Sequence, residues 1–391
     1  MPTEIRIVTG KKDLEQFIRL PMQLHAKREN FVPPLLHDER RFYDKRFNNA
    51  LNFSETILAL AYENNICSGR IMGIIPLEHN KLQNEKTARF FNLDCVNDFN
   101  VCKALIDFVE QWAFEKGMNQ IIGPFGFSDK DPQGFQIEGF EFLPVIATPV
   151  NPAYMPSLIE LCSYKKMLDC LSYKMMIPDE VPEYYNRIYQ RVMNRSNLKL
   201  IEFKRRSELR PFIIPVFELI NEAYRDIFGF MAMHKAEMDY MANQYLPVLD
   251  PDYVKCIVNE HNDLIAFVIA MPHMSEGLKE ANGKLFPFGF IHILIAMRKT
   301  RQLNLLLGAV ANKYQGLGLT TALGIKLFES AKKNRMEFID SHLILETNLR
   351  MRAELERLGA LIYKRYRIYS KGLLLTSAIF INSQKNLWRS L

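Results

Sequence analysis

Residues Val310–Leu323 read VANKYQGLGLTTAL and join an apolar run at 303–310 to an amphipathic pattern that begins at Leu319. Gly316 and Gly318 stand where the chain must turn between the two. A strand that ends in such a turn directs several backbone N–H groups, and the positive end of the next helix dipole, toward one point. The stretch therefore predicts a strand–turn–helix unit that binds a phosphate-bearing ligand. An ordinary turn of an α/β protein, with no ligand, is the open alternative.

The composition indicates an ordered globular protein. The chain has 391 residues, enough for two domains, and is 48% hydrophobic and 24% charged. The net charge of +6 favours anionic ligands, and no Lys/Arg block is long enough to indicate nucleic acid. The six cysteines form no C-x-x-C pair, which predicts reduced thiols and no metal site. With neither a signal peptide nor a membrane-spanning run, we expect a cytoplasmic protein, and peripheral membrane contact stays open.

The two halves of the chain repeat one order of elements. In each half, hairpin strands precede a helix, and a strand follows the motif Lys116-Gly-Met118 or Asn334-Arg-Met336. An internal duplication is therefore predicted. We expect an N-terminal domain at 1–178, a linker helix at 179–198, a C-terminal domain at 199–373 and a tail at 374–391.

Three motifs in order resemble those of the GNAT acyltransferase superfamily. Lys313-Tyr-Gln-Gly316-Leu-Gly318 fits the cofactor turn, and Leu345-Glu-Thr-Asn348 followed by Leu358-Gly359 fits the later motifs. The whole chain is also similar to bacterial two-domain GNAT-like proteins, some of which are associated with N-acylation of lipid amines. The resemblance implies an α/β (α+β) fold with two tandem GNAT-like domains, each a mixed, mostly antiparallel sheet flanked by helices.

The resemblance also implies a cosubstrate, either acyl-CoA or the acyl-phosphopantetheine arm of a carrier protein, and no metal. Backbone amides of the turn would bind its pyrophosphate, and Lys313 would add positive charge. An amide at the end of the preceding strand would polarise the acyl carbonyl. The expected cofactor-binding residues are Val310, Lys313, Gln315, Gly316, Leu317, Gly318, Leu319, Thr320 and Asn348.

Acyl transfer to an amine also needs groups that move protons. Glu346, at a predicted strand end, is our candidate base, although it could equally cap the next helix. His292, in a predicted strand at Gly289–Ile295, is a candidate relay, against the alternative of a structural buried histidine. Glu222 and Tyr224 could line the acceptor site.

One departure from the family affects the proton donor. The family's usual donor tyrosine corresponds to Leu355, so the donor would be Tyr369, another nearby tyrosine (Tyr363 or Tyr366) or solvent.

A second departure lies in the first half, which has Asp94 and Asp98 where its glycine turn should be. We expect these carboxylates to repel a pyrophosphate, so this half has lost cofactor binding. The glycine-rich loop at 123–138 is either a lid or a packed structural loop.

The sequence thus predicts an N-acyltransferase that acts on a small-molecule or lipid amine, with an acyl carrier protein as an alternative donor. A non-catalytic ligand-binding or regulatory protein with the same fold is the other interpretation.

Overall fold

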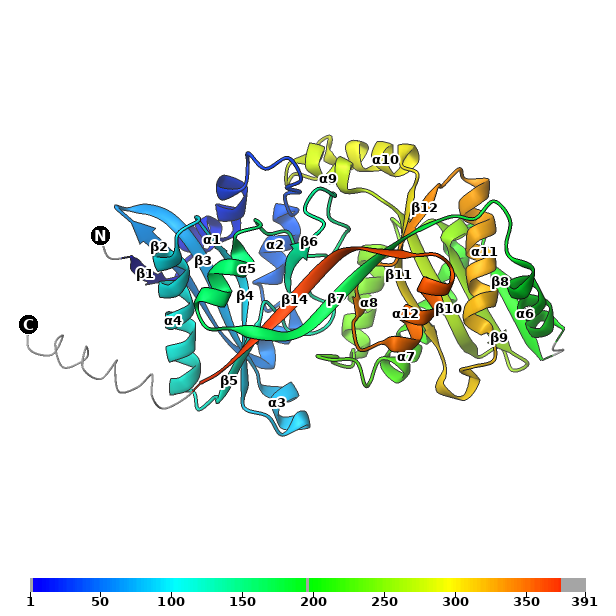
Figure 1. Cartoon of the computed structure of the whole chain (residues 1–391), viewed down its shortest axis with the longest axis horizontal. Coiled ribbons are helices and arrows are strands. Elements are labelled where there is room, and N and C mark those ends of the chain that lie inside the picture. Colours follow the sequence, from blue (N-terminus) through cyan, green and yellow to red (C-terminus); the bar gives the residue numbers. More distant parts are fainter. Residues whose placement is uncertain (1–2, 195–196, 374–391) are drawn as a thin grey trace, which may run out of the picture. The chain divides into compact units, whose positions relative to one another are not determined.

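The computed structural model describes residues 3–194 and 197–373, so the expected tail at 374–391 lies outside the described residues. The chain forms two compact units. Unit 1 contains the described residues up to Cys170, residues 282–285 and the described residues from Arg365 onward. Unit 2 contains Leu171–Ala281 and Phe286–Lys364. Each unit contains its own run of neighbouring strands with helices on them, and the strands Lys165–Met176 and Leu361–Gly372 have residues in both units (Figure 1).

The sheet of unit 1 has the strand order β1-β2-β3-β4-β5-β14. All neighbours are antiparallel except β4 and β5, which are parallel. The strands are β1 (Glu4–Ile7), β2 (Ser54–Glu63), β3 (Ile66–Pro76), β4 (Thr87–Cys95), β5 (Gln120–Gly123) and β14 (Leu361–Gly372), and β6 (Phe135–Glu138) also pairs with β14. The helices are α1 (Lys11–Leu24), α2 (Leu36–Phe42), α3 (Leu77–Gln83), α4 (Phe99–Glu115) and α5 (Met155–Leu161).

The sheet of unit 2 has the order β7-β12-β11-β10-β9-β8. Its neighbours are also antiparallel except for one parallel pair, β11 and β12. The strands are β7 (Lys165–Met176), β8 (Leu198–Glu202), β9 (Val254–Asn259), β10 (Leu264–Pro272), β11 (Gln302–Val310) and β12 (Phe338–Asp340), and β13 (Ile344–Leu345) pairs with β7. The helices are α6 (Glu183–Met193), α7 (Ile213–Ala223), α8 (Lys235–Tyr245), α9 (Ser275–Ala281), α10 (Gly289–Lys299), α11 (Leu319–Lys333) and α12 (Leu349–Arg357).

The pairing pattern confirms the expected fold class and supports the duplication. Five consecutive strands of each half pair with one another in the same order and directions. The last strand of each half pairs with a strand of the other half. Strand β7, the last of the first half, pairs with β12, and β14, the last of the second half, pairs with β5. The compact units therefore differ from the contiguous ranges 1–178 and 199–373 expected for the domains. Tyr366, Ile368 and Tyr369 of β14 are fully buried (Figure 1, red strand).

Residues with positive φ follow two of these elements. Asn64 and Asn65 form the hairpin turn between β2 and β3, and Gly117, with a φ of 80°, follows the C-cap of α4 at Lys116. Among the described residues, no helix combines the length and apolar character needed to cross a membrane.

The predicted strand at Gly289–Ile295 is wrong, because these residues belong to helix α10. Short apolar runs do not distinguish strand from helix. The two buried residues of α10, Gly289 and Ile293, lie one helical turn apart, so the helix buries only one narrow side. The predicted strand at Phe338–Leu345 is also interrupted, since His342 between β12 and β13 has a φ of 58°.

Candidate functional site

Strand β11 separates from its parallel neighbour before it reaches the glycine turn. The ladder between β11 and β12 covers three residue pairs and ends at Asn304 and Asp340. Toward β10, Ile269 pairs with Leu307 and Ala270 with Leu305, so Leu306 is the extra residue of a β-bulge. The last part of β11 thus continues toward the turn after its pairing with β12 has ended. We call this part the released end of β11.

The glycine turn has the predicted form. Gly316 and Gly318 have φ values of 76° and 88°, and Gly318 is the N-cap of α11. Among the described residues, no side chain caps this helix end, so the first N–H groups of α11 are available to a ligand. A Cβ at Gly316 would meet no described atom within 4 Å, whereas one at Gly318 would lie 2.6 Å from Cγ2 of Ile188 on α6. Gly318 therefore serves helix packing, and Gly316 leaves open space.

Positive charge lies beside the turn. Lys313 is exposed, and Arg350 Nη1 donates a 3.0 Å hydrogen bond to Gln315 Oε1. Asn348 Oδ1 accepts a 3.2 Å bond from Met351 N, so Asn348 caps α12. Helix α12 thus contacts the glycine turn through Arg350, while the role of Asn348 in cofactor binding stays a prediction. Arg350, which we had not predicted, makes the direct contact.

The end of α7 contacts both sides of the turn. Glu222 Oε1 accepts a 3.0 Å hydrogen bond from Asn312 N. The Tyr224 hydroxyl lies 3.1 Å from Gly308 O and 3.4 Å from Gly308 N on β11. Tyr224 therefore places its hydroxyl against the part of β11 that has left β12.

A buried polar cluster lies where β11 and β12 part. Asn304 Nδ2 is 3.3 Å from His273 Nδ1, and the Tyr363 hydroxyl donates to Asp340 Oδ2. Asn304, Asp340 and Lys364 are each at most 1% exposed. Burial, assisted by the positive charge of Lys364, lowers the pKa of His273 to about 4, so this imidazole is neutral at pH 7. Of this cluster, we had named only Tyr363 from the sequence.

Two of the proposed catalytic residues, Glu346 and His292, lie on different elements. Glu346 follows β13 and is partly exposed, and its carbonyl oxygen accepts a 2.9 Å hydrogen bond from Arg352. Its role as a base stays a prediction. His292 is exposed on α10, so the expected position on a strand beside β11 is wrong.

The expected alternative donor Tyr369 lies in unit 1. It is buried in that unit's core, and its hydroxyl donates a 3.0 Å hydrogen bond to Glu160. Burial raises its pKa well above the usual value, with a further contribution from that bond. Leu355, at the family's usual donor position, is packed in the core of unit 2.

In unit 1, two aspartates lie at the position that corresponds to the glycine turn of unit 2. Asp98 Oδ1 accepts a 2.7 Å bond from Asn100 N and caps α4, as expected. Asp94 is instead buried between Arg70 and His25, at 2.8 and 3.0 Å. Although burial opposes its ionisation, these partners hold the pKa of Asp94 at about 2.

The loop at 123–138 is held within unit 1. Arg89 donates hydrogen bonds of 2.9 and 2.8 Å to the carbonyl oxygens of Gly126 and Phe127, and Asp131 accepts one of 2.6 Å from Phe127 N. Residues 121–128 are buried. These contacts favour the packed structural loop over the lid.

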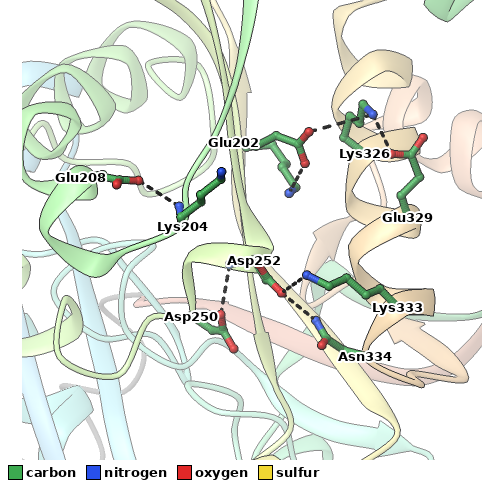
Figure 2. Close-up of polar contacts among 10 residues, drawn as sticks. Glu202, Lys204, Glu208, Asp250, Asp252, Lys326, Glu329, Lys333 and Asn334 are labelled. Atoms are coloured by element: carbon green, nitrogen blue, oxygen red, sulfur yellow. Dashed lines mark hydrogen bonds and ion pairs between the residues drawn. The ribbon is translucent and has the colours of Figure 1, made fainter.

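Charged contacts fix the direction of α11, the helix that begins at the turn. Figure 2 shows Glu202 of β8 facing Lys326 of α11, at 4.0 Å. Lys255 of β9 also contacts Glu202, at 2.8 Å. At the other end of α11, Lys333 and Asn334 both contact Asp252. The middle of α11 is thus held to β8, and its C-terminal end to the short 3-10 helix Pro251–Tyr253 before β9.

Comparisons with known proteins identify the fold. The chain has the tandem GNAT fold. It aligns with a tandem GNAT protein from the clavulanic acid biosynthesis pathway at a TM-score of 0.55 and 12% identity, over 95% of this chain and 99% of the other. A GCN5-related N-acetyltransferase from Sphaerobacter thermophilus matches at 0.50 and 10% identity, over 95% and 96% of the two chains. No family model matches the sequence.

Two curated proteins are similar over nearly the full length. Protein YghO of Escherichia coli (strain K12) is 27% identical over 374 residues, covering 94% of this chain and 95% of that protein. The bacterial ceramide synthase of Caulobacter vibrioides is 25% identical over 373 residues, covering 92% and 95%. These similarities agree with the resemblance seen in the sequence.

Proposed function

We propose that the protein is an N-acyltransferase that moves an acyl group from a phosphopantetheine thioester to an amine. The single observation that carries this proposal is the released end of β11, which runs into a turn with open space at Gly316 and an uncapped helix N-terminus. Anionic phosphates bind at such helix ends. Lys313 and Arg350 add positive charge at the same place.

The reaction is a direct transfer. The amine nitrogen attacks the thioester carbonyl carbon, the C–S bond breaks, and the thiolate leaves. A backbone N–H of β11 near Gly308 polarises the carbonyl oxygen. The amine gives up one proton to a base, for which Glu346 is our candidate, and Tyr224 donates one to the thiolate. The contacts of the Tyr224 hydroxyl with Gly308 support this role.

The donor and acceptor are the finer part of the proposal. We propose acyl-CoA as the donor, with an acyl carrier protein as the alternative that the same turn would accept. Similarity to a bacterial ceramide synthase supports a long-chain lipid amine as the acceptor. The cytoplasmic location expected from the sequence remains part of the proposal.

A cofactor titration tests the proposal. Calorimetry with coenzyme A, acetyl-CoA and palmitoyl-CoA would compare the wild type with Lys313→Glu and with Lys199→Glu, an exposed lysine on β8. We expect Lys313→Glu alone to weaken binding. Gly318 is a poor probe, because a side chain there would clash with Ile188. Thiol release would then be measured over short-chain and long-chain amines.

Two results would count against the proposal. If the wild type binds none of the three ligands, and no acyl carrier protein transfers its acyl group, the turn is not a cofactor site. If the ligands bind but no amine causes thiol release, the protein is a non-catalytic binding protein.

A further inference from the structure

Helix α10 and the residues before it expose large apolar side chains. Phe286 is 74% exposed and Phe288 is 66% exposed, and four more exposed apolar residues follow on the helix. These four are Phe290, Ile291, Leu294 and Ile295. Contiguous apolar surface of this kind marks a binding surface for a protein or a membrane.

The other side of α10 is packed against α9. Gly289 and Ile293 are the buried residues of α10. The two helices are so close that a Cβ at Gly277 of α9 would lie 2.5 Å from the Cα of Ile293. The exposed residues 290, 291, 294 and 295 follow helical spacing and so share the opposite face. This face is therefore fixed outward by the packing behind it.

The charged residues that flank this stretch in the sequence are basic. The sequence contains no Asp or Glu between residues 281 and 328. Arg298 and Lys299 follow Leu294 and Ile295 by four residues and so continue the exposed face, and Lys284 precedes the apolar stretch. All three side chains are exposed. Apolar and aromatic residues flanked by Lys and Arg are typical of helices that lie in the interface of an anionic membrane.

We propose that the exposed face of Phe286–Lys299 binds the surface of an anionic lipid bilayer. Its apolar side chains enter the interfacial region, and Arg298 and Lys299 lie near the lipid phosphates. The proposal depends on this surface alone and does not require the transfer reaction. A second copy of the chain fits less well, because a two-fold contact through this face would bring its basic residues together.

Vesicle co-sedimentation tests this surface on the full chain. One set of vesicles contains phosphatidylcholine alone. The other contains phosphatidylcholine with about 30% phosphatidylglycerol, so that roughly one-third of its lipids are anionic. The variants are Leu294→Gln/Ile295→Gln and Arg298→Glu/Lys299→Glu. The matched control is Ile66→Gln/Leu82→Gln, which removes apolar residues that are 71% and 68% exposed in unit 1.

We expect the wild type and the control to bind the anionic vesicles. The apolar variant should bind both vesicle types at least about tenfold more weakly. The charge variant should lose about fivefold per basic residue on anionic vesicles only, and high salt should weaken the wild type similarly. Circular dichroism would show that each variant is folded.

Three outcomes would overturn the proposal. The wild type could fail to bind anionic vesicles, or the control could lose as much binding as the α10 variants. The wild type could instead self-associate without vesicles while the apolar variant is monomeric, which would make the face a protein interface. Coenzyme A binding, measured separately, distinguishes any of these from failure of the cofactor site.

Discussion

The hydroxyl oxygen of Tyr224 lies 3.4 Å from the backbone nitrogen of Gly308, so the end of α7 contacts β11 just before the glycine turn. Gly308 lies within the part of β11 that has left β12 and is exposed. A backbone donor and an ionisable hydroxyl thus share one point on the released strand. In the proposed transfer reaction, the backbone N–H would polarise the carbonyl oxygen and the hydroxyl would protonate the departing sulfur.

Tyr224→Phe should slow transfer without weakening cofactor binding. The variant keeps the ring, which packs edge-on against Phe230 at 6.3 Å, and removes only the hydroxyl. We expect kcat to fall about 100-fold, as for the loss of a general acid, while the Kd for acyl-CoA changes little. Tyr184→Phe, on the exposed side of α6, is the control. An unchanged kcat would show that solvent or another group protonates the thiolate.

Arg350→Ala should weaken cofactor binding. The guanidinium is held at the turn by Gln315, and it would meet the phosphates as a charged hydrogen-bond donor. We expect about a fivefold rise in Kd, and a smaller rise for Arg350→Lys, which keeps the charge. The difference from the wild type should shrink as salt increases. Arg357→Ala, at the other end of α12, should bind as the wild type does; equal losses in both variants would contradict a specific role.

Acidification should destabilise the fold between pH 6.5 and 4 because of His273. Burial lowers its pKa from 6.5 to about 4 in the folded state. The unfolded chain therefore takes up the proton first, so this stability is present above pH 6.5 and is lost as the pH falls toward 4. His273→Asn should reduce the loss over that window by up to about 3 kcal/mol.

Urea unfolding at several pH values measures the effect. His261→Asn, whose imidazole is 74% exposed, is the control and should keep the wild-type pH dependence. Some slope should persist in His273→Asn, since burial lowers the pKa of His79 to about 4 as well. A pH profile identical to that of the wild type would show that His273 is not the titrating group.

Sequence patterns predicted the regular elements well and the tertiary partners poorly. Helix α11 begins at Leu319, as expected from the sequence, because the glycine turn and the amphipathic pattern after it give a clear start signal. Helix α10 was predicted as a strand because its residues are apolar on nearly every side. A helix with one packed face and one bare apolar face lacks the polar face that marks amphipathic helices.

In the site, too, the local element could be predicted from the sequence, but its tertiary partners could not. The glycine turn could be predicted because its glycines and helix start are contiguous in sequence. Tyr224 contacts the strand before the turn, Arg350 contacts the turn itself, and His273 contacts Asn304 where β11 and β12 part. These positions depend on strand register and helix packing. Local sequence carries little information about either. The exchange of β7 and β14 is hidden for a related reason, since the two halves end in similar strands.

That exchange predicts that residues 1–178 alone will not form a stable unit 1. Without β14, the edge of β5 is unpaired and the sites of Tyr366, Ile368 and Tyr369 are empty. Burial of each such side chain stabilises a fold by about 1.5–3 kcal/mol, which is a large part of a domain's stability. Residues 1–178 should therefore aggregate or unfold without cooperativity. Fusion of residues 361–373 through a Gly/Ser linker should restore a cooperative thermal transition, whereas the same fusion with Ile368→Asp should not. A cooperative transition of the unfused fragment would mean that β7 can take the place of β14, and that the contiguous domain boundaries expected from the sequence are sufficient for folding.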